Sequence, residues 1–157
     1  MRIYPIRVYA DTSVFGGAFD DEFREASEAF FVQAREGQFS LVTSVVVRRE
    51  LEPAPLEVRE FLEAVTEGVA VVELSQEAIQ LQRAYLAQGI VGAKRGPDAL
   101  HIALATCAAC PLVVSWNFRH HVHVDKIRLY CAVNALMGYP QIDIRTPEEV
   151  VRHEEEV

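Results

Sequence analysis

The chain has 157 residues, of which 50% are hydrophobic and 24% are charged. This composition is typical of one soluble globular domain whose core is large enough to fold without disulfides or a structural metal. We find no apolar run near the ~18 residues of a membrane span and no apolar leader segment, so we expect a cytoplasmic protein without a membrane partner. The net charge of −8 is unfavourable for a surface that binds polyanions through basic side chains.

The three cysteines are Cys107, Cys110 and Cys131. Their odd number and irregular spacing argue against a disulfide framework. Cys107 and Cys110 form a C-x-x-C motif, but the chain has no second pair with the spacing of a zinc site, and the motif ends an apolar run instead of beginning a helix. We therefore expect packed, free thiols.

Short apolar runs alternate with amphipathic stretches along the chain. The expected strands, in chain order, are residues 6–10, 39–44, 69–74, 112–116 and 141–146. The expected helices are residues 20–36, 44–52, 56–67, 75–89, 97–109 and part of 118–137. The remaining segments are interpreted as a loop over 92–96 and a polar C-terminal segment over 147–157. Strands that alternate with helices predict βαβ units and a largely parallel sheet.

Several residues mark the ends of these helices. Ser44 and Ser75 are expected N-caps, because their hydroxyls can accept hydrogen bonds from backbone N–H groups of the first turn. Gly37 and Gly89 are expected helix stops, and Pro97 suits the first turn of its helix.

Four polar residues lie near the points where expected strands end and helices begin. Asp11 follows the first strand, Asn117 follows the fourth, Asp98 opens a helix, and Glu50 lies in the helix after the second strand. Ligands bind outside the carboxyl ends of the strands in parallel sheets. Each residue also has an ordinary structural explanation, as a turn former, a helix-terminal charge or a solvated side chain. Spacing alone leaves open whether the four converge.

Their arrangement resembles a known family. The segments that carry the resemblance are VYADTSVFGG, SVVVRRELE, PDALHIALAT followed by VVSWNFRHH, and VNALMGYPQIDIRTPEEVV. In this order they resemble the PIN-domain nucleases, and in particular the VapC-like toxins of type II toxin–antitoxin systems. The resemblance spans essentially the whole length. It implies a single PIN-like domain over residues 1–157, of the α/β class, with a central, largely parallel sheet sandwiched by helices.

The resemblance also implies an activity and its partners. It implies a Mg²⁺- or Mn²⁺-dependent endoribonuclease that hydrolyses RNA phosphodiester bonds and serves as the toxin of a toxin–antitoxin pair. RNA is then the substrate, a cognate antitoxin is the protein partner, and a homodimer is the expected assembly. Bound divalent cations would make the acidic site locally positive, which partly answers the objection from the negative net charge.

Residue by residue, Asp11, Glu50 and Asp98 match the acids of the family, and Asn117 matches a position where many members have a fourth acid. Asp11 and Asp98 are expected to hold the first metal, with Glu50 acting directly or through water. Asn117 leaves three charges instead of four, which puts a second metal in doubt. The supporting residues, expected to hydrogen-bond the carboxylates or the phosphate, are Thr12, Ser13 and Ser115.

The carboxylates also have a physical reason to hold a cation. Two carboxylates about 4 Å apart repel by roughly 4 kcal/mol at an effective dielectric of 20. Three of them in one pocket are therefore costly unless a cation lies between them. Hard oxygen ligands favour Mg²⁺ or Mn²⁺ over zinc.

Histidines and basic residues supply weaker candidates. His101, three residues after Asp98, is either a contact to the outer shell of the metal or a phosphate, or an ordinary packed histidine. The H-H-x-H motif is not expected to bind a transition metal, because adjacent helical residues point in different directions; it consists of His120, His121 and His123. Possible contacts to RNA phosphates are Arg48, Arg49, Lys94, Arg95 and Arg119.

Two other functions stay open on the sequence. One is a PIN-like module that binds RNA or protein with weak or no catalysis, which Asn117 favours. The other is a phosphatase that uses Asp11 as its nucleophile, although that class usually has a second aspartate two residues later, where this chain has Ser13.

Overall fold

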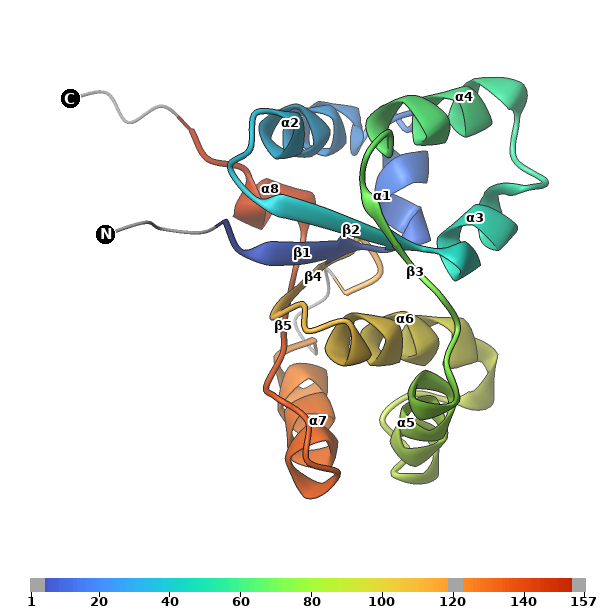
Figure 1. The fold of residues 1–157 in the computed structure, drawn as a ribbon, viewed down its shortest axis with the longest axis vertical. Coiled ribbons are helices and arrows are strands. Elements are labelled where there is room, and N and C mark those ends of the chain that lie inside the picture. Colours follow the sequence, from blue (N-terminus) through green and yellow to red (C-terminus); the bar gives the residue numbers. More distant parts are fainter. Residues whose placement is uncertain (1–4, 119–122, 154–157) are drawn as a thin grey trace.

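A parallel sheet of five strands occupies the centre of the fold (Figure 1), in a computed structural model that describes residues 5–118 and 123–153. The strands are β1 (Arg7–Ala10), β2 (Ser40–Ser44), β3 (Ala70–Val72), β4 (Leu112–Val114) and β5 (Asp143–Arg145). They lie in the order β3-β2-β1-β4-β5, and all neighbours are parallel. All five predicted strands are confirmed. The chain changes direction across the sheet between β1 and β4, which is the kind of position where open parallel sheets bind ligands.

Helices cover both faces of this sheet. They are α1 (Thr12–Gly17), α2 (Arg24–Arg35), α3 (Val45–Leu51), α4 (Leu56–Val65), α5 (Gln76–Ala87), α6 (Gly96–Cys107), α7 (His123–Leu136) and α8 (Pro147–Val150). Figure 1 shows α1, α2 and α4 on one side of the sheet and α5, α6 and α7 on the other. The predicted sandwich of helices around a parallel sheet is therefore confirmed. Within the described residues, no helix is both long enough and apolar enough to cross a membrane.

The predicted helix ends are confirmed where a side chain or a glycine sets them. Ser44 accepts a hydrogen bond from the Val47 backbone N–H at 3.2 Å, and Ser75 accepts one from Ala78 at 3.1 Å. Gly37, after α2, has a φ of 83°, in the left-handed region where a side chain would be strained.

Three local predictions were incomplete or wrong. The predicted helix 20–36 begins only at Arg24, because the Asp20 side chain accepts from the Glu22 backbone N–H at 2.9 Å and holds a turn before it. Part of the predicted loop 92–96 is a 3-10 turn over Ala93–Arg95 that leads directly into α6. The C-terminal segment contains α8, whose first turn is closed by a capping box between Thr146 and Glu149.

The core fills the space between the sheet and the two helix layers. Val8, Tyr9 and Ala10 of β1 are fully buried, as expected for a central strand covered on both faces. The three cysteines are free, as predicted. Cys110 is buried among the core side chains, so it packs as a small apolar residue.

Two adjacent glycines in α1 are expected to respond oppositely to alanine. A Cβ at Gly17 would lie 2.6 Å from Ser27 Oγ and 2.7 Å from Trp116 Nε1, which are themselves hydrogen-bonded at 2.9 Å. Gly17→Ala should therefore lower the free energy of unfolding by about 1–3 kcal/mol through overpacking. A Cβ at Gly16 meets nothing within 4 Å, so Gly16→Ala should raise it by up to about 1 kcal/mol. Urea unfolding of both variants measures the difference, and equal shifts of the same sign would contradict this packing.

Candidate active site

Asp11 lies at the switch point of the sheet, directly after β1. Its backbone N–H donates to the carbonyl of Val114 in β4 at 3.1 Å, which fixes it between the two central strands. The side chain caps α1 by accepting from the Ser13 backbone N–H at 3.0 Å, and it is only 1% exposed. The hydroxyl of Ser13 donates to Asp11 Oδ1, and that of Ser115 donates to Oδ2, each at 2.5 Å. Both carboxylate oxygens of Asp11 are thus held by hydroxyl donors.

A hydrogen-bonded path links Asp11 to Asp98. Ser115 Oγ, which donates to Asp11, accepts from the Asn117 backbone N–H at 3.0 Å. The Asn117 side-chain amide in turn donates to Asp98 Oδ1 at 3.0 Å. The other Asp98 oxygen lies 4.0 Å from the guanidinium of Arg95, in the turn before α6. Asn117 therefore connects the end of β4 to the first turn of α6.

Glu50 completes the cluster from α3. The hydroxyl of Thr12 donates to Glu50 Oε1 at 2.8 Å, and His101 Nε2 lies 2.5 Å from the same oxygen. The Glu50 side chain is 34% exposed, whereas Val46, one helical turn earlier, packs in the core. The same face of α3 thus supplies both a core contact and an acid at the site.

All the site residues predicted from the sequence meet in this cluster. They are Asp11, Thr12, Ser13, Glu50, Asp98, Ser115 and Asn117. The positions of these side chains agree with a common site, whereas their individual roles in catalysis and metal binding stay predictions.

The sequence did not decide between two roles for His101, and it gave no prediction of a role for Tyr9. The Tyr9 hydroxyl is buried and lies 2.7 Å from His101 Nδ1. A signal for Tyr9 was available, because it precedes Asp11 by two residues and alternate residues of a strand share a face.

The electrostatics of the cluster reflect its burial. Burial raises the pKa of the Asp11 carboxyl, and the charge of Asp98 adds to this, although His101 and the two serine hydroxyls oppose it. Burial by itself lowers the pKa of His101, but the hydrogen bond with Glu50 and the negative charges of Asp11 and Glu50 outweigh it and raise the pKa. The pKa of Glu50 is lowered, because its hydrogen bond to His101 and the His101 charge outweigh burial.

The donor set suits a hard divalent cation. Asp11 is a buried carboxylate, and no lysine or arginine among the described residues forms an ion pair with it. In residues 5–118 and 123–153, no group of three or more His, Cys, Asp or Glu side chains stands close enough together to hold a metal. Mg²⁺ needs no such cage, since it keeps several waters and binds through one or two carboxylates. The chemistry of Asp11 and Asp98 therefore fits Mg²⁺ or Mn²⁺.

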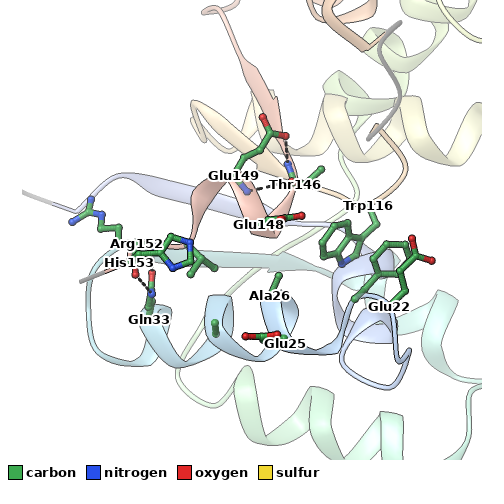
Figure 2. Close-up of a pocket in the computed structure, with 13 residues that line it drawn as sticks. Glu22, Glu25, Ala26, Gln33, Trp116, Thr146, Glu148, Glu149, Arg152 and His153 are labelled. Carbon is green, nitrogen blue, oxygen red and sulfur yellow. Dashed lines mark hydrogen bonds between the residues drawn. The ribbon is translucent and has the colours of Figure 1, made fainter. Parts of the chain in front are cut away.

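A pocket of about 810 Å³ lies beside this cluster, between α2 and the segment around α8. Figure 2 shows Trp116 at one end of it and the Gln33–Arg152 hydrogen bonds at the other. Trp116 lines the pocket and also contacts the site, because its backbone N–H donates to Ser13 Oγ at 2.9 Å. The acidic side chains that line the pocket are Glu22, Glu25, Glu148 and Glu149. Arg152 and His153 also line it, so the walls carry groups of both charges.

Several weaker candidates have no described role at the site. Arg119, His120 and His121 lie outside the described residues, and so does the side chain of His123. Arg48 lies 3.6 Å from Glu63.

Comparison with known proteins identifies the fold. No protein-family model matches the sequence, and no curated protein is similar enough to count as a relative. Among solved structures, the chain resembles one in the crystal structure of VapBC2 from Rickettsia felis bound to a DNA fragment from their promoter. The two chains superpose with a TM-score of 0.60 over 90% of this chain and 98% of that one, at 12% sequence identity. The chain has a PIN-like fold. The PIN-like fold and its parallel sheet were both predicted from the sequence, and both are confirmed.

Proposed function

We propose that this protein is a Mg²⁺- or Mn²⁺-dependent endoribonuclease and the toxin of a toxin–antitoxin pair. The observation that supports this most is the path that joins two carboxylates at the switch point of a PIN-like sheet. Ser115 and Asn117 connect the buried Asp11 to Asp98, and each carboxylate accepts a hydrogen bond from a neutral side chain. Carboxylates oriented in this way at the end of a parallel sheet suit a cation and a phosphodiester.

The residues have separable roles in this proposal. Asp11 and Asp98 would hold the cation, and Glu50 would contact it directly or through water. A bound divalent cation supplies positive charge to the scissile phosphate and lowers the pKa of water. Ser13 and Ser115 fix the Asp11 carboxylate through its two oxygens, so its orientation is set before any ligand arrives.

The proposed partners follow from the same assignment. The similar structure contains VapBC2 bound to a promoter DNA fragment. By analogy, we propose a cognate antitoxin that blocks the acidic site of this chain, a homodimer as its assembly, and the cytoplasm as its location. A small neighbouring gene for a DNA-binding protein would be the expected genetic context.

A second candidate function is a PIN-like module that binds RNA or protein without turnover. Asn117 favours it, because an amide stands where a further acid would strengthen cation binding. The phosphatase alternative is less compatible with the geometry. Ser13 stands where that class usually has its second aspartate, and its hydroxyl donates to Asp11 Oδ1.

Cleavage of a generic RNA by the purified protein tests the proposal. Wild type should cleave in Mn²⁺ or Mg²⁺ and lose activity in EDTA. Asp98→Asn should lower the rate on the order of a hundredfold, because a metal contributes several kcal/mol of charge stabilisation. Asp21→Asn is the matched control, since its side chain is 98% exposed and pairs with Arg24. RNA binding without cleavage under every divalent ion would instead support the non-catalytic module.

A further inference from the structure

A buried chain of hydrogen bonds runs from the end of β2 to Glu50. The Ser44 hydroxyl lies 2.8 Å from the Tyr9 hydroxyl, and the Tyr9 hydroxyl lies 2.7 Å from His101 Nδ1. His101 Nε2 lies 2.5 Å from Glu50 Oε1. The four side chains come from four elements of the fold, β1, β2, α3 and α6, and one of the predicted site acids ends the series.

Burial makes this chain of hydrogen bonds rigid. Ser44 and Tyr9 are fully buried and His101 is 3% exposed, whereas the Glu50 side chain is 34% exposed. Only the acid at the end of the chain is therefore substantially open to solvent. A buried polar network whose members are all partnered specifies one arrangement, because each broken bond leaves an unsatisfied polar group.

The side chains joined by these hydrogen bonds lie on, or next to, the elements that carry the three predicted site acids. Tyr9 precedes Asp11 by two residues at the end of β1, and His101 follows Asp98 by three residues on α6. Ser44 is the N-cap of α3, the helix that carries the third acid. Hydrogen bonds between these side chains therefore tie together the three elements whose spacing sets the geometry of the site.

We propose that Tyr9 and His101 are positioning residues that hold the Glu50 carboxylate in a fixed place relative to Asp11 and Asp98. The neutral Nε2–H form and the protonated form of His101 both carry a proton on Nε2, and an ionised carboxylate can only accept it. The Tyr9 hydroxyl holds the imidazole ring from its other nitrogen, Nδ1. This is the arrangement by which outer residues orient a metal ligand. The consequence for metal binding rests on the proposed function.

Tyr9→Phe is the sharpest test, because Tyr85→Phe is a matched control. Both tyrosines are fully buried, and the Tyr85 hydroxyl donates to Asn134 outside the site. Each variant loses one buried hydroxyl and should lower the melting temperature in EDTA by a similar amount. Only Tyr9→Phe should weaken Mn²⁺ binding, on the order of tenfold or more in Kd by titration calorimetry well below the melting temperature. Equal Mn²⁺ affinities for the two variants and wild type would overturn the proposal.

A double variant tests whether Tyr9 and His101 act through one chain. His101→Gln should weaken Mn²⁺ binding as Tyr9→Phe does, since it removes the ring that bridges Tyr9 and Glu50. The double variant should then bind no more weakly than the weaker single variant, because either change already breaks the chain. Losses that multiply in the double variant would show independent effects and contradict a single positioning chain.

Nuclear magnetic resonance of the metal-free protein separates this inference from the nuclease proposal. The Nε2 proton of His101 should exchange slowly enough to be observed in wild type and Tyr85→Phe, and it should be lost or broadened in Tyr9→Phe. An unchanged signal in Tyr9→Phe would overturn the positioning role whatever the activity. If wild type binds Mn²⁺ without cleaving RNA, the nuclease proposal fails while the affinity test still decides the positioning role. If wild type binds no Mn²⁺, the imidazole proton alone decides it.

Discussion

Asp11→Asn is expected to reduce RNA cleavage by roughly a thousandfold, equivalent to about 4 kcal/mol, while the protein stays folded. The substitution preserves shape, and an amide oxygen can still accept the hydrogen bonds that Ser13 donates to the carboxylate. It removes the negative charge that is most deeply buried in the cluster. Rates measured on a generic RNA in Mn²⁺ check the result. A variant that cleaves as fast as wild type would remove Asp11 from the site.

The same substitution should stabilise the protein in EDTA. Burial raises the pKa of Asp11 above its unfolded value, so the ionised carboxylate is disfavoured in the folded state. This cost is absent below the unfolded pKa of about 4 and grows as the pH rises toward the folded pKa. The melting temperature of Asp11→Asn should therefore exceed that of wild type by an amount that increases with pH above about 4.

Added Mn²⁺ should reverse the order of the two melting temperatures, so that wild type becomes more stable than Asp11→Asn. A ligand that binds only the folded state stabilises it, so Mn²⁺ should raise the melting temperature of wild type and leave Asp11→Asn nearly unchanged. Asp21→Asn is again the control, and it should follow wild type under both conditions. An Asp11→Asn protein that is less stable than wild type in EDTA would mean that the carboxylate is structural, with no cost for a cation to relieve.

Sequence patterns predicted the five strands better than the short helices α1 and α8. Residues TSVFGG of α1 contain two glycines and several poor helix formers, so propensity alone gives no helix there. The helix forms because Asp11 caps it and because Val14 and Phe15 are buried in the core. For α8 the signal was present and overlooked, since Thr146 followed three residues later by Glu149 is the pattern of a capping box.

Convergence of the acids could not be predicted from spacing, because it depends on how β1, α3 and α6 pack. The resemblance to PIN domains led to the expectation that the acids converge, and the structure brings the same side chains together. Strand alternation could have placed Tyr9 on the same face as Asp11, but neither spacing nor the resemblance predicts the hydrogen bond between Tyr9 and His101. In the sequence, Tyr9 is one apolar-looking residue of a core strand and His101 is one histidine in an apolar helix. Their role emerges only once the hydroxyl and the imidazole are seen 2.7 Å apart.

Asn117→Asp is expected to change metal binding and stability in opposite directions. The Asn117 amide now donates to Asp98 Oδ1 at 3.0 Å, and a carboxylate there would replace this hydrogen bond by repulsion. At about 4 Å such a pair costs about 1 kcal/mol in water and about 4 kcal/mol at an effective dielectric of 20. The free energy of unfolding in EDTA should fall by at least the smaller value. Mn²⁺ binding should tighten by at least about fivefold, because the cation relieves the repulsion.

Calorimetric titration with Mn²⁺ also gives the number of sites, which connects Asn117 to the choice between the two candidate functions. If Asn117 limits the site to one firmly held cation, the aspartate variant should bind a second one and cleave RNA faster than wild type. Gln80→Glu adds the same unit of negative charge on the exposed face of α5, so it controls for net charge. Tighter Mn²⁺ binding in Gln80→Glu as well would reduce the effect to general electrostatics. A change confined to Asn117→Asp would mean that the amide sets how much positive charge this PIN-like site can present to a phosphodiester.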